Sequence, residues 1–280
     1  MKPAFSCNDG PARAGFTRAD LVAALAVAAL LAVVTKPVWA GFNGARILGC
    51  RDNLRRLQSA WLMYAHDNEG RLIGSYSDAS GTPSERHLVN PAWVSGWLDW
   101  ETSPANTNVL LLTTPRYAPL WPYLQPDPAV YKCPADEYVS PIQVRWGWTS
   151  RVRSYSANAF MGKSAGYVPY EKGRRLYHRL GDFARKPPAE LYVFLEEHPD
   201  SIFGGGFVPP DSTRNKWVGI PSSLHAGSAN FSFVDGHVEQ RVWENPAIVQ
   251  PVMYLYNVNQ PGTLEDPDFR WVWERTSEPE

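Results

Sequence analysis

The sequence predicts an α+β fold in which one long N-terminal helix packs on an antiparallel β-sheet with long loops. Three observations lead to this fold class. An apolar run followed by an amphipathic pattern of helical period occupies residues 16–70. Most of the 25 Pro, 21 Gly and 12 Trp follow residue 70, which is typical of short strands joined by structured loops. A hairpin motif near the C-terminus supplies two strands.

The composition limits the class of protein and of partner. With 280 residues, 44% of them apolar and 13% aromatic, the chain can build a substantial core. The 27 Lys and Arg nearly balance the 28 Asp and Glu, and the pI is about 6.6. This balance gives no electrostatic reason to expect a nucleic-acid partner.

The first element is the apolar run at residues 21–34, which must meet lipid or be removed. As a helix its 14 residues rise only about 21 Å, so length alone does not separate a thin membrane span from a signal-peptide core. Asp20 opens the run, and a carboxylate in lipid needs a partner. In a helical filament, the new α-amino group of Phe16 on a neighbouring subunit would supply that partner.

The segment Gly15-Phe16-Thr17-Arg18-Ala19-Asp20-Leu21 resembles the N-terminus of type IV prepilins and type II secretion pseudopilins. In that family a prepilin peptidase cuts after Gly and methylates the new Phe, and an acid stands fifth in the mature chain. The resemblance implies processing at Gly15 and Phe16, assembly through Asp20, and a helix-bending proline, here Pro37. The family usually has Glu at the Asp20 position and an apolar residue at the Arg18 position.

Two other interpretations fit the same segment. An ordinary signal peptide would use Lys2, Arg13 and Arg18 as its basic region and would be cut after Val38-Trp39-Ala40, before Gly41. An uncleaved anchor would have the same topology as a prepilin. All three place the residues beyond 41 outside the cytoplasm, and the prepilin interpretation makes the chain a single-pass protein of the bacterial inner membrane.

The second element is an amphipathic helix that ends near Gly70. The side chains of its apolar stripe alternate three and four apart: Ile47, Cys50, Leu54, Leu57, Trp61 and Tyr64. An antiparallel sheet built from the following residues is the simplest cover for this stripe. We therefore expect a leader at 1–15, a membrane and assembly helix at 16–40, its amphipathic continuation at 41–70, and a β-rich extracytoplasmic domain at 71–280.

Motifs in the body extend the resemblance along the chain. Cys50 to Leu57 and Tyr64 to Gly70 resemble a set of bacterial pilin-like proteins, as do Cys133-Pro134-Ala135-Asp136 and Ser154-Tyr155-Ser156-Ala157-Asn158. His225, nine residues before Asp235-Gly236, matches the prepilin-processing-associated H-X9-DG family. Asp235-Gly236 also predicts a two-residue type I′ turn between strands.

Candidate ligand sites are few. His225, His237 and Glu239 could offer zinc-type ligands, because His237 and Glu239 would share one face of a strand. Glu197 and Asp200 follow the predicted strand 191–195 and, with backbone carbonyls of the next Gly-rich loop, could bind calcium; the resemblance to major pseudopilins implies such a site. Cys50 and Cys133 could form a disulfide or stay unpaired.

The sequence predicts a structural protein and not an enzyme, because it holds no nucleophile elbow, zincin motif, phosphate loop or dinucleotide fingerprint. The expected partners are a prepilin peptidase, sister pilin-like subunits and the inner membrane. The alternative function is a tethered or secreted binding module that does not polymerise. It would use aromatic side chains of residues 75–150 to hold a polysaccharide or protein, although these side chains could instead fill the core.

Overall fold

The computed structural model describes residues 17–76, 91–124, 126–163, 173–255 and 260–280, without the side chains of residues 29–43. The chain divides into two compact units, Met1–Gly44 and Ala45–Glu280. Helix α1 (Arg18–Asp67) contributes to both units. The predicted processing site at Gly15 and Phe16 lies outside the described residues, as does the side chain of Pro37.

In the first unit, a reciprocal cap starts α1. The backbone N–H and the hydroxyl of Thr17 donate to the Asp20 carboxylate at 2.9 and 2.7 Å, and the Asp20 N–H donates to the Thr17 hydroxyl. This capping box satisfies backbone donors at the helix start. Among the described residues, no helix holds a stretch of sufficient length and apolar character to cross a membrane.

The second unit is built from the last part of α1, a five-stranded sheet, a two-stranded sheet and short helices. The strands are β1 (Tyr155–Asn158), β2 (Tyr192–Glu196), β3 (Gly206–Phe207), β4 (Lys216–Trp217), β5 (Ser228–Phe233), β6 (Val238–Val242) and β7 (Gln260–Pro261). The other α-helices are α3 (Leu110–Thr113), α4 (Pro141–Arg145) and α5 (Pro267–Thr276). Short 3₁₀ helices cover Pro104–Asn106, Trp121–Tyr123, Pro128–Tyr131, Leu180–Asp182, Pro188–Glu190 and Pro246–Ile248.

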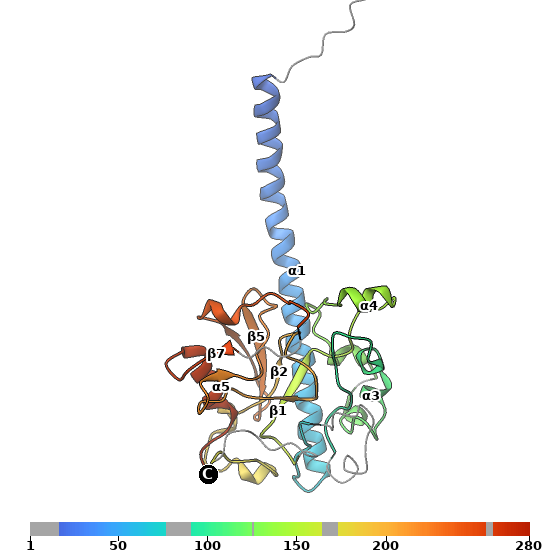
Figure 1. Ribbon diagram of the computed structural model, residues 1–280, viewed down its shortest axis with the longest axis vertical. Helices are drawn as coiled ribbons and strands as arrows, with labels where there is room; N and C mark the ends of the chain where they lie inside the picture. Colours follow the sequence, from blue (N-terminus) through green and yellow to red (C-terminus); the bar gives the residue numbers. More distant parts are fainter. Residues whose placement is uncertain (1–16, 77–90, 125, 164–172, 256–259) are drawn as a thin grey trace, which may run out of the picture. The chain divides into compact units, whose positions relative to one another are not determined.

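The main sheet has the strand order β3-β1-β2-β5-β6, and β4 pairs with β7 in the smaller sheet. The pairs β1–β2, β2–β5 and β5–β6 are antiparallel, whereas β1–β3 is parallel. Figure 1 shows α1 running beside β1 and β2, with α5 and β7 on one side and α3 and α4 on the other. The predicted α+β class is thus confirmed, with a mostly antiparallel sheet under the helix.

The amphipathic stripe of α1 forms the core against the sheet, as predicted. Cys50, Leu54, Leu57 and Trp61 are all buried, and they belong to one apolar cluster with side chains of β1, β2 and β6. The helix ends near the predicted place. Gly70, at φ +77°, donates its N–H to the Ala65 carbonyl across a distance of 2.8 Å, which is the six-residue closure of a Schellman C-cap.

A β-bulge in β2 decides which side chains face α1. Tyr192 pairs with Phe233 and Phe194 pairs with Ser232, so two steps along β2 oppose one step along β5. Tyr192 and Leu195 pack on the far face of the sheet, while Val193 and Phe194 both join the cluster under α1. Strict alternation from Tyr192 would send Glu196 to the far face. The extra residue turns Glu196 toward the helix instead, where it contacts Cys50.

The far face of the sheet is covered by the C-terminal part of the chain. Phe231 and Phe233 of β5 pack there with Trp217 of β4 and with Phe269 of α5. The hydroxyl groups of Tyr192 and Thr276 hydrogen-bond at 2.9 Å, which joins β2 to the end of α5. Both faces are therefore buried, which explains why every residue of β5 is buried and not only alternate ones.

The β5–β6 hairpin forms where the sequence predicts it, but its turn differs from the predicted type I′. Phe233 accepts the Gly236 N–H at 2.9 Å and donates to the His237 carbonyl, so three residues connect the paired positions. Gly236 has φ +97°, whereas Asp235 does not adopt a positive φ. This is a type I turn closed by a left-handed Gly, which makes a three-residue hairpin loop. The side chain of Asp235 accepts the His237 N–H instead of favouring a left-handed backbone.

Two leucines of α1 test the helix–sheet interface. Leu57 is 0% exposed and Leu48 is 64% exposed. We expect Leu57→Ala to lower the free energy of unfolding by about 2–5 kcal/mol, because it leaves a cavity between helix and sheet. Leu48→Ala should change it by no more than about 0.5 kcal/mol. Urea unfolding of both variants provides the measurement, and equal effects would contradict the described packing.

Candidate functional site

Four side chains with metal-ligating or nucleophilic atoms meet inside the second unit. They are Cys50 on α1, Cys133 in the loop after residue 131, Glu196 at the end of β2, and His225 before β5. One ligand atom from each lies within 4.8 Å of the others, and all four residues are buried. We call this set the Cys–Glu–His cluster. It lies where α1 crosses the end of β2.

The contacts within the cluster are direct. His225 Nε2 lies 2.7 Å from Glu196 Oε1 and 3.3 Å from Cys133 Sγ. The Cys50 thiol donates to the same Glu196 oxygen. Cys50 and Cys133 are both free cysteines. Oε1 of Glu196 is therefore the atom around which the other groups gather.

A second layer of donors surrounds the cluster. The Tyr155 hydroxyl donates to Cys50 Sγ at 3.2 Å. Asn230 donates twice to Glu196 Oε2, from its backbone N–H at 2.7 Å and from its side-chain amide at 3.0 Å. These donors aim at sulfur and oxygen atoms that can carry negative charge, and they hold Glu196 so that its other oxygen faces the cluster.

Burial and mutual contact shift the pKa values of the cluster. Burial opposes charge on His225, but its hydrogen bonds to Cys133 and Glu196 outweigh this effect and raise the pKa of His225 to about 10. Burial also opposes charge on Glu196, yet the contacts with His225 lower the pKa of this carboxyl. Burial raises the pKa of the Cys50 thiol. Near neutral pH, the cluster alone therefore holds a buried imidazolium–carboxylate pair and a neutral Cys50 thiol.

The motifs that were dispersed in the sequence meet around this cluster. Cys133 belongs to the Cys-Pro-x-Asp step, whose Asp136 accepts the hydroxyl of Ser154 at 2.6 Å. Ser154 opens the Ser-Tyr-x-x-Asn step, whose Tyr155 reaches Cys50. His225 opens the H-X9-DG motif. The motif that begins at Cys50, the Cys-Pro-x-Asp step and the H-X9-DG motif therefore supply three cluster residues, and the Ser-Tyr-x-x-Asn step supplies the neighbouring hydroxyls.

Sequence reasoning considered Cys50 and Cys133 only as a possible disulfide pair, and it did not select Glu196 at all. Glu196 begins an acidic stretch in which Glu197 and Asp200 were the candidate ligands, and nothing in the spacing separates it from Glu197. Only the bulge in β2 places it under α1. A buried carboxylate at the end of an otherwise apolar strand was the available signal, since such a group needs a partner.

The H-X9-DG motif spans one strand and does not form one site. His225 lies before β5 and Asp235-Gly236 lies after it, so the two ends of the motif mark opposite ends of the strand. His237 contacts Asp235 at 2.6 Å and lies 4.0 Å from Glu239, on an exposed part of the hairpin. His225 is thus not brought together with His237 and Glu239. The candidate zinc-type set of these three residues was therefore wrong, because the length of β5 separates His225 from the other two.

Glu197 and Asp200, the predicted calcium ligands, are both buried. The Ser201 hydroxyl donates to Glu197 at 2.6 Å, and the Met253 N–H donates to Asp200 at 2.7 Å. Burial raises the pKa of Glu197 to about 7, since hydrogen bonds and the Arg153 charge only partly oppose it. Protein groups thus already occupy one oxygen of each carboxylate, and the calcium site stays a prediction.

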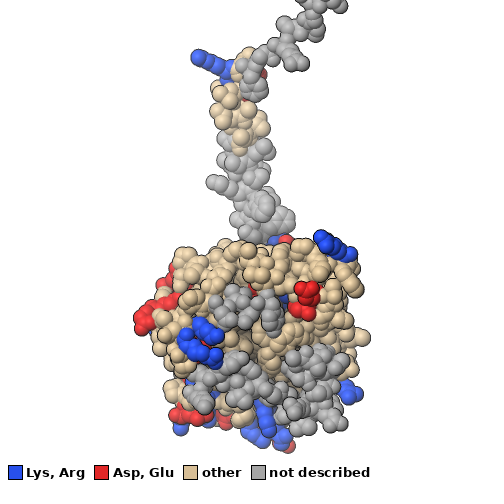
Figure 2. All heavy atoms as spheres, in the orientation of Figure 1, with Lys and Arg blue, Asp and Glu red and all other residues tan. Residues whose placement is uncertain are grey.

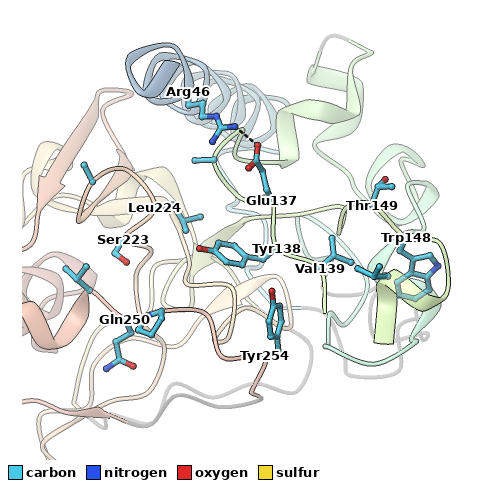
Figure 3. A pocket seen from close by; sticks show the side chains of 15 residues that line it. Arg46, Glu137, Tyr138, Val139, Trp148, Thr149, Ser223, Leu224, Gln250 and Tyr254 are labelled. Atoms are coloured by element: carbon cyan, nitrogen blue, oxygen red, sulfur yellow. Dashed lines mark hydrogen bonds and ion pairs between the residues drawn. The ribbon is translucent and has the colours of Figure 1, made fainter. Parts of the chain in front are cut away.

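The aromatic side chains of the middle region divide between core and surface. Trp93 is fully buried and Trp100 nearly so, whereas Trp146 is exposed. Trp148 lines an open pocket of about 1230 Å³ with Tyr138 and Tyr254. Figure 3 shows this pocket between α1, where Arg46 meets Glu137, and the loops that carry Leu224 and Gln250. The core interpretation thus holds for Trp93 and Trp100, whereas the aromatic binding surface stays a prediction.

The two sites differ in what they can do chemically. The Cys–Glu–His cluster offers two sulfur, one nitrogen and one oxygen ligand, or two thiols able to pair, but its burial excludes a substrate-sized molecule. The pocket in Figure 3 is open and offers aromatic rings and hydroxyls to a ligand. A comparison of the chain with family models, with curated proteins and with solved structures finds no match.

The hairpin half of the H-X9-DG motif can be tested separately from the cluster. Gly236→Ala would force a side chain onto a backbone at φ +97°, and we expect it to lower the free energy of unfolding by about 1–2 kcal/mol. Gly181→Ala is the matched control, because a Cβ there meets open space without a positive φ. It should leave the free energy unchanged or slightly higher. An equal loss in both variants, measured by urea unfolding, would argue against a conformational role for Gly236.

Proposed function

We propose that this protein is a pilin-like or pseudopilin-like structural subunit of the bacterial inner membrane. A prepilin peptidase processes it after Gly15, and the first part of α1 anchors it and packs against the same helix of sister subunits in a pilus or secretion pseudopilus. The domain after residue 70 lies outside the cytoplasm. The observation that carries this proposal is a contrast within α1: the aliphatic side chains at its start are exposed, whereas its later part is buried on one face.

The start of α1 carries apolar side chains that are exposed. Leu21, Val22, Leu25 and Val27 are each more than half exposed, although they are aliphatic. The later half, from Cys50 onward, is buried on one face only, against the sheet. Exposed aliphatic side chains at the start of a helix fit packing against lipid or sister helices, and head-to-tail packing of that kind builds filaments.

Asp20 is suited to a contact that would form only when subunits assemble. In the single chain its carboxylate accepts from Thr17 at the helix start. Removal of residues 1–15 would create a charged amine at Phe16, and an Asp20 of a neighbouring subunit could pair with it. A capping carboxylate has lone pairs left for this second partner.

The surface of the globular unit fits the absence of a nucleic-acid role. On the face in Figure 2, the coloured Lys and Arg side chains lie among Asp and Glu and do not gather into one basic patch. The net charge of the chain is −1. Binding to a phosphate backbone depends on clustered positive charge.

The mature N-terminus tests the processing step. We expect mass spectrometry of the membrane fraction to find a chain that begins at methylated Phe16, because the Gly15–Phe16 junction precedes the helix by only two residues. A Gly15→Ala variant places a bulkier residue before the junction. It should therefore accumulate as the full-length precursor. A chain that begins at Gly41 would remove the anchor and contradict assembly through α1.

The Asp20 contact tests assembly itself. We expect Asp20→Ala to abolish sedimentable filaments, since breaking a buried charge pair costs about 3–5 kcal/mol, roughly a hundred-fold or more in each subunit contact. Thr17→Ala is the matched control. It removes the cap that touches Asp20 but keeps the carboxylate, so filaments should persist. Loss of filaments in both variants would mean that Asp20 acts only through the helix cap.

A second candidate function rests on the pocket in Figure 3. Trp148, Tyr138 and Tyr254 offer ring surfaces of the kind that hold sugars or peptides. This function is a tethered or secreted binding module that does not polymerise. Under this second function, the Asp20→Ala variant would still bind the ligand and the Trp148→Ala variant would not. This pattern distinguishes a binding module from an assembly subunit.

A further inference from the structure

We propose that the Cys–Glu–His cluster is a structural zinc site that fastens α1 to the end of the sheet. This inference does not depend on the proposed assembly function. It starts from the ligand atoms: two sulfurs, one imidazole nitrogen and one carboxylate oxygen, all within 4.8 Å of one another. Two thiolates and an imidazole are the ligands that Zn²⁺ favours in proteins, and a carboxylate completes a set of four.

The distances suit a tetrahedral ion. Zinc–sulfur bonds of about 2.3 Å and zinc–nitrogen or zinc–oxygen bonds of about 2.0 Å set neighbouring ligands roughly 3.3–3.8 Å apart. Cys133 Sγ and His225 Nε2 are already 3.3 Å apart. His225 Nε2 and Glu196 Oε1 are closer, at 2.7 Å, and would separate by under about 1 Å around the ion. The Cys50 thiol, which contacts the same Glu196 oxygen, would move away from it by a similar amount.

The orientation of Glu196 selects one oxygen as the ligand. Its Oε2 accepts both donors of Asn230, while its Oε1 faces Cys50 and His225. This is the arrangement of a monodentate carboxylate ligand held by outer hydrogen bonds. Asn230 and Tyr155 are the positioning residues, and neither supplies a ligand atom.

A divalent ion would offset most of the negative charge that its deprotonated ligands carry. Two thiolates and Glu196 carry three negative charges, which Zn²⁺ reduces to one. The remaining charge meets O–H and N–H donors: Tyr155 at Cys50, the Ala135 N–H at Cys133 and Asn230 at Glu196. Buried negative charge is stable only with such partners.

The four ligands come from parts of the chain that are far apart, so the ion would act as a cross-link. It would join α1, the loop after residue 131, the end of β2 and the segment before β5. With four protein ligands and a buried position, the site is closed, which is the property of structural and not catalytic zinc. A Cys50–Cys133 disulfide would also join two of these parts, but it would leave Glu196 and His225 without the role for which they are placed.

Metal analysis of the full chain purified in detergent tests the site, with Cys7→Ser as background so that only Cys50 and Cys133 carry thiols. We expect about one Zn²⁺ per chain, bound with two thiols that react only after a chelator is added. Chelation should lower the melting temperature, and added Zn²⁺ should restore it. Co²⁺ in place of Zn²⁺ should give the visible bands of a tetrahedral thiolate centre.

Variants separate ligands from ordinary core residues. Glu196→Gln and Cys50→Ser should each lower zinc affinity by at least about ten-fold. Leu54→Ala, one turn after Cys50 and equally buried, should destabilise the chain yet retain zinc at full occupancy. Asn230→Ala should weaken zinc binding and shift the Co²⁺ bands, an effect that loss of packing alone would not produce.

Two outcomes would overturn the proposal. The first is a Cys50–Cys133 disulfide in the chain isolated under non-reducing conditions, seen as an intact mass lower by two hydrogens. The second is a chain with two free thiols that takes up no Zn²⁺ or Co²⁺. Both are read on the unmutated ligand set, so they hold even if a ligand variant fails to fold.

Discussion

Between Cys50 and Trp61, α1 turns one face toward the sheet, and Cys50, Leu54, Leu57 and Trp61 on that face are buried. The apolar contact beneath them joins β1, β2 and β6 in one cluster. The rest of the second unit is arranged around this contact, because the sheet needs α1 on one face and α5 with β4 on the other to bury its strands. Removing either cover would expose strands that are apolar on both faces.

An apolar interface of this kind fixes burial but not register, since hydrophobic contact has no direction. Cys50 lies at the N-terminal end of the buried stripe, and its hydrogen bonds to polar neighbours are directional. Glu196 meets the helix there because of the bulge at Val193, and Asn230 and His225 meet Glu196 from β5 and the segment before it. The cluster thus specifies where along the sheet the helix lies, in the way that a polar group in a coiled-coil core specifies register.

The proposed assembly and the proposed zinc site place different structural requirements on the two parts of α1. Assembly needs the first half of α1 to stay uncovered by its own domain, so that it can meet lipid or sister helices. The later half must stay packed on the sheet, so that each assembled helix carries its own domain. A cross-link at Cys50, near the start of the buried half, would hold α1 at the place where the two demands meet.

Much of the fold was determined by the sequence alone. The three-and-four spacing from Cys50 to Trp61 gives the amphipathic helix and its buried face, because helical period depends only on local geometry. Gly70 marks the helix end, and Asp235-Gly236 marks the hairpin, because turns depend on a few neighbouring residues. The Gly15–Phe16 junction lies outside the described residues, so the expectation of processing there rests on the sequence.

Only the tertiary structure decided which polar residues meet. Cys50, Cys133, Glu196 and His225 are far apart in the chain, and no local rule relates them. Glu196 and Glu197 are neighbours of the same type, yet a single extra residue in β2 sends the first toward α1. The strand between His225 and Asp235 separates two residues that one motif unites. Pairing between strands sets these positions, and such pairing is a property of the folded sheet and not of any short segment.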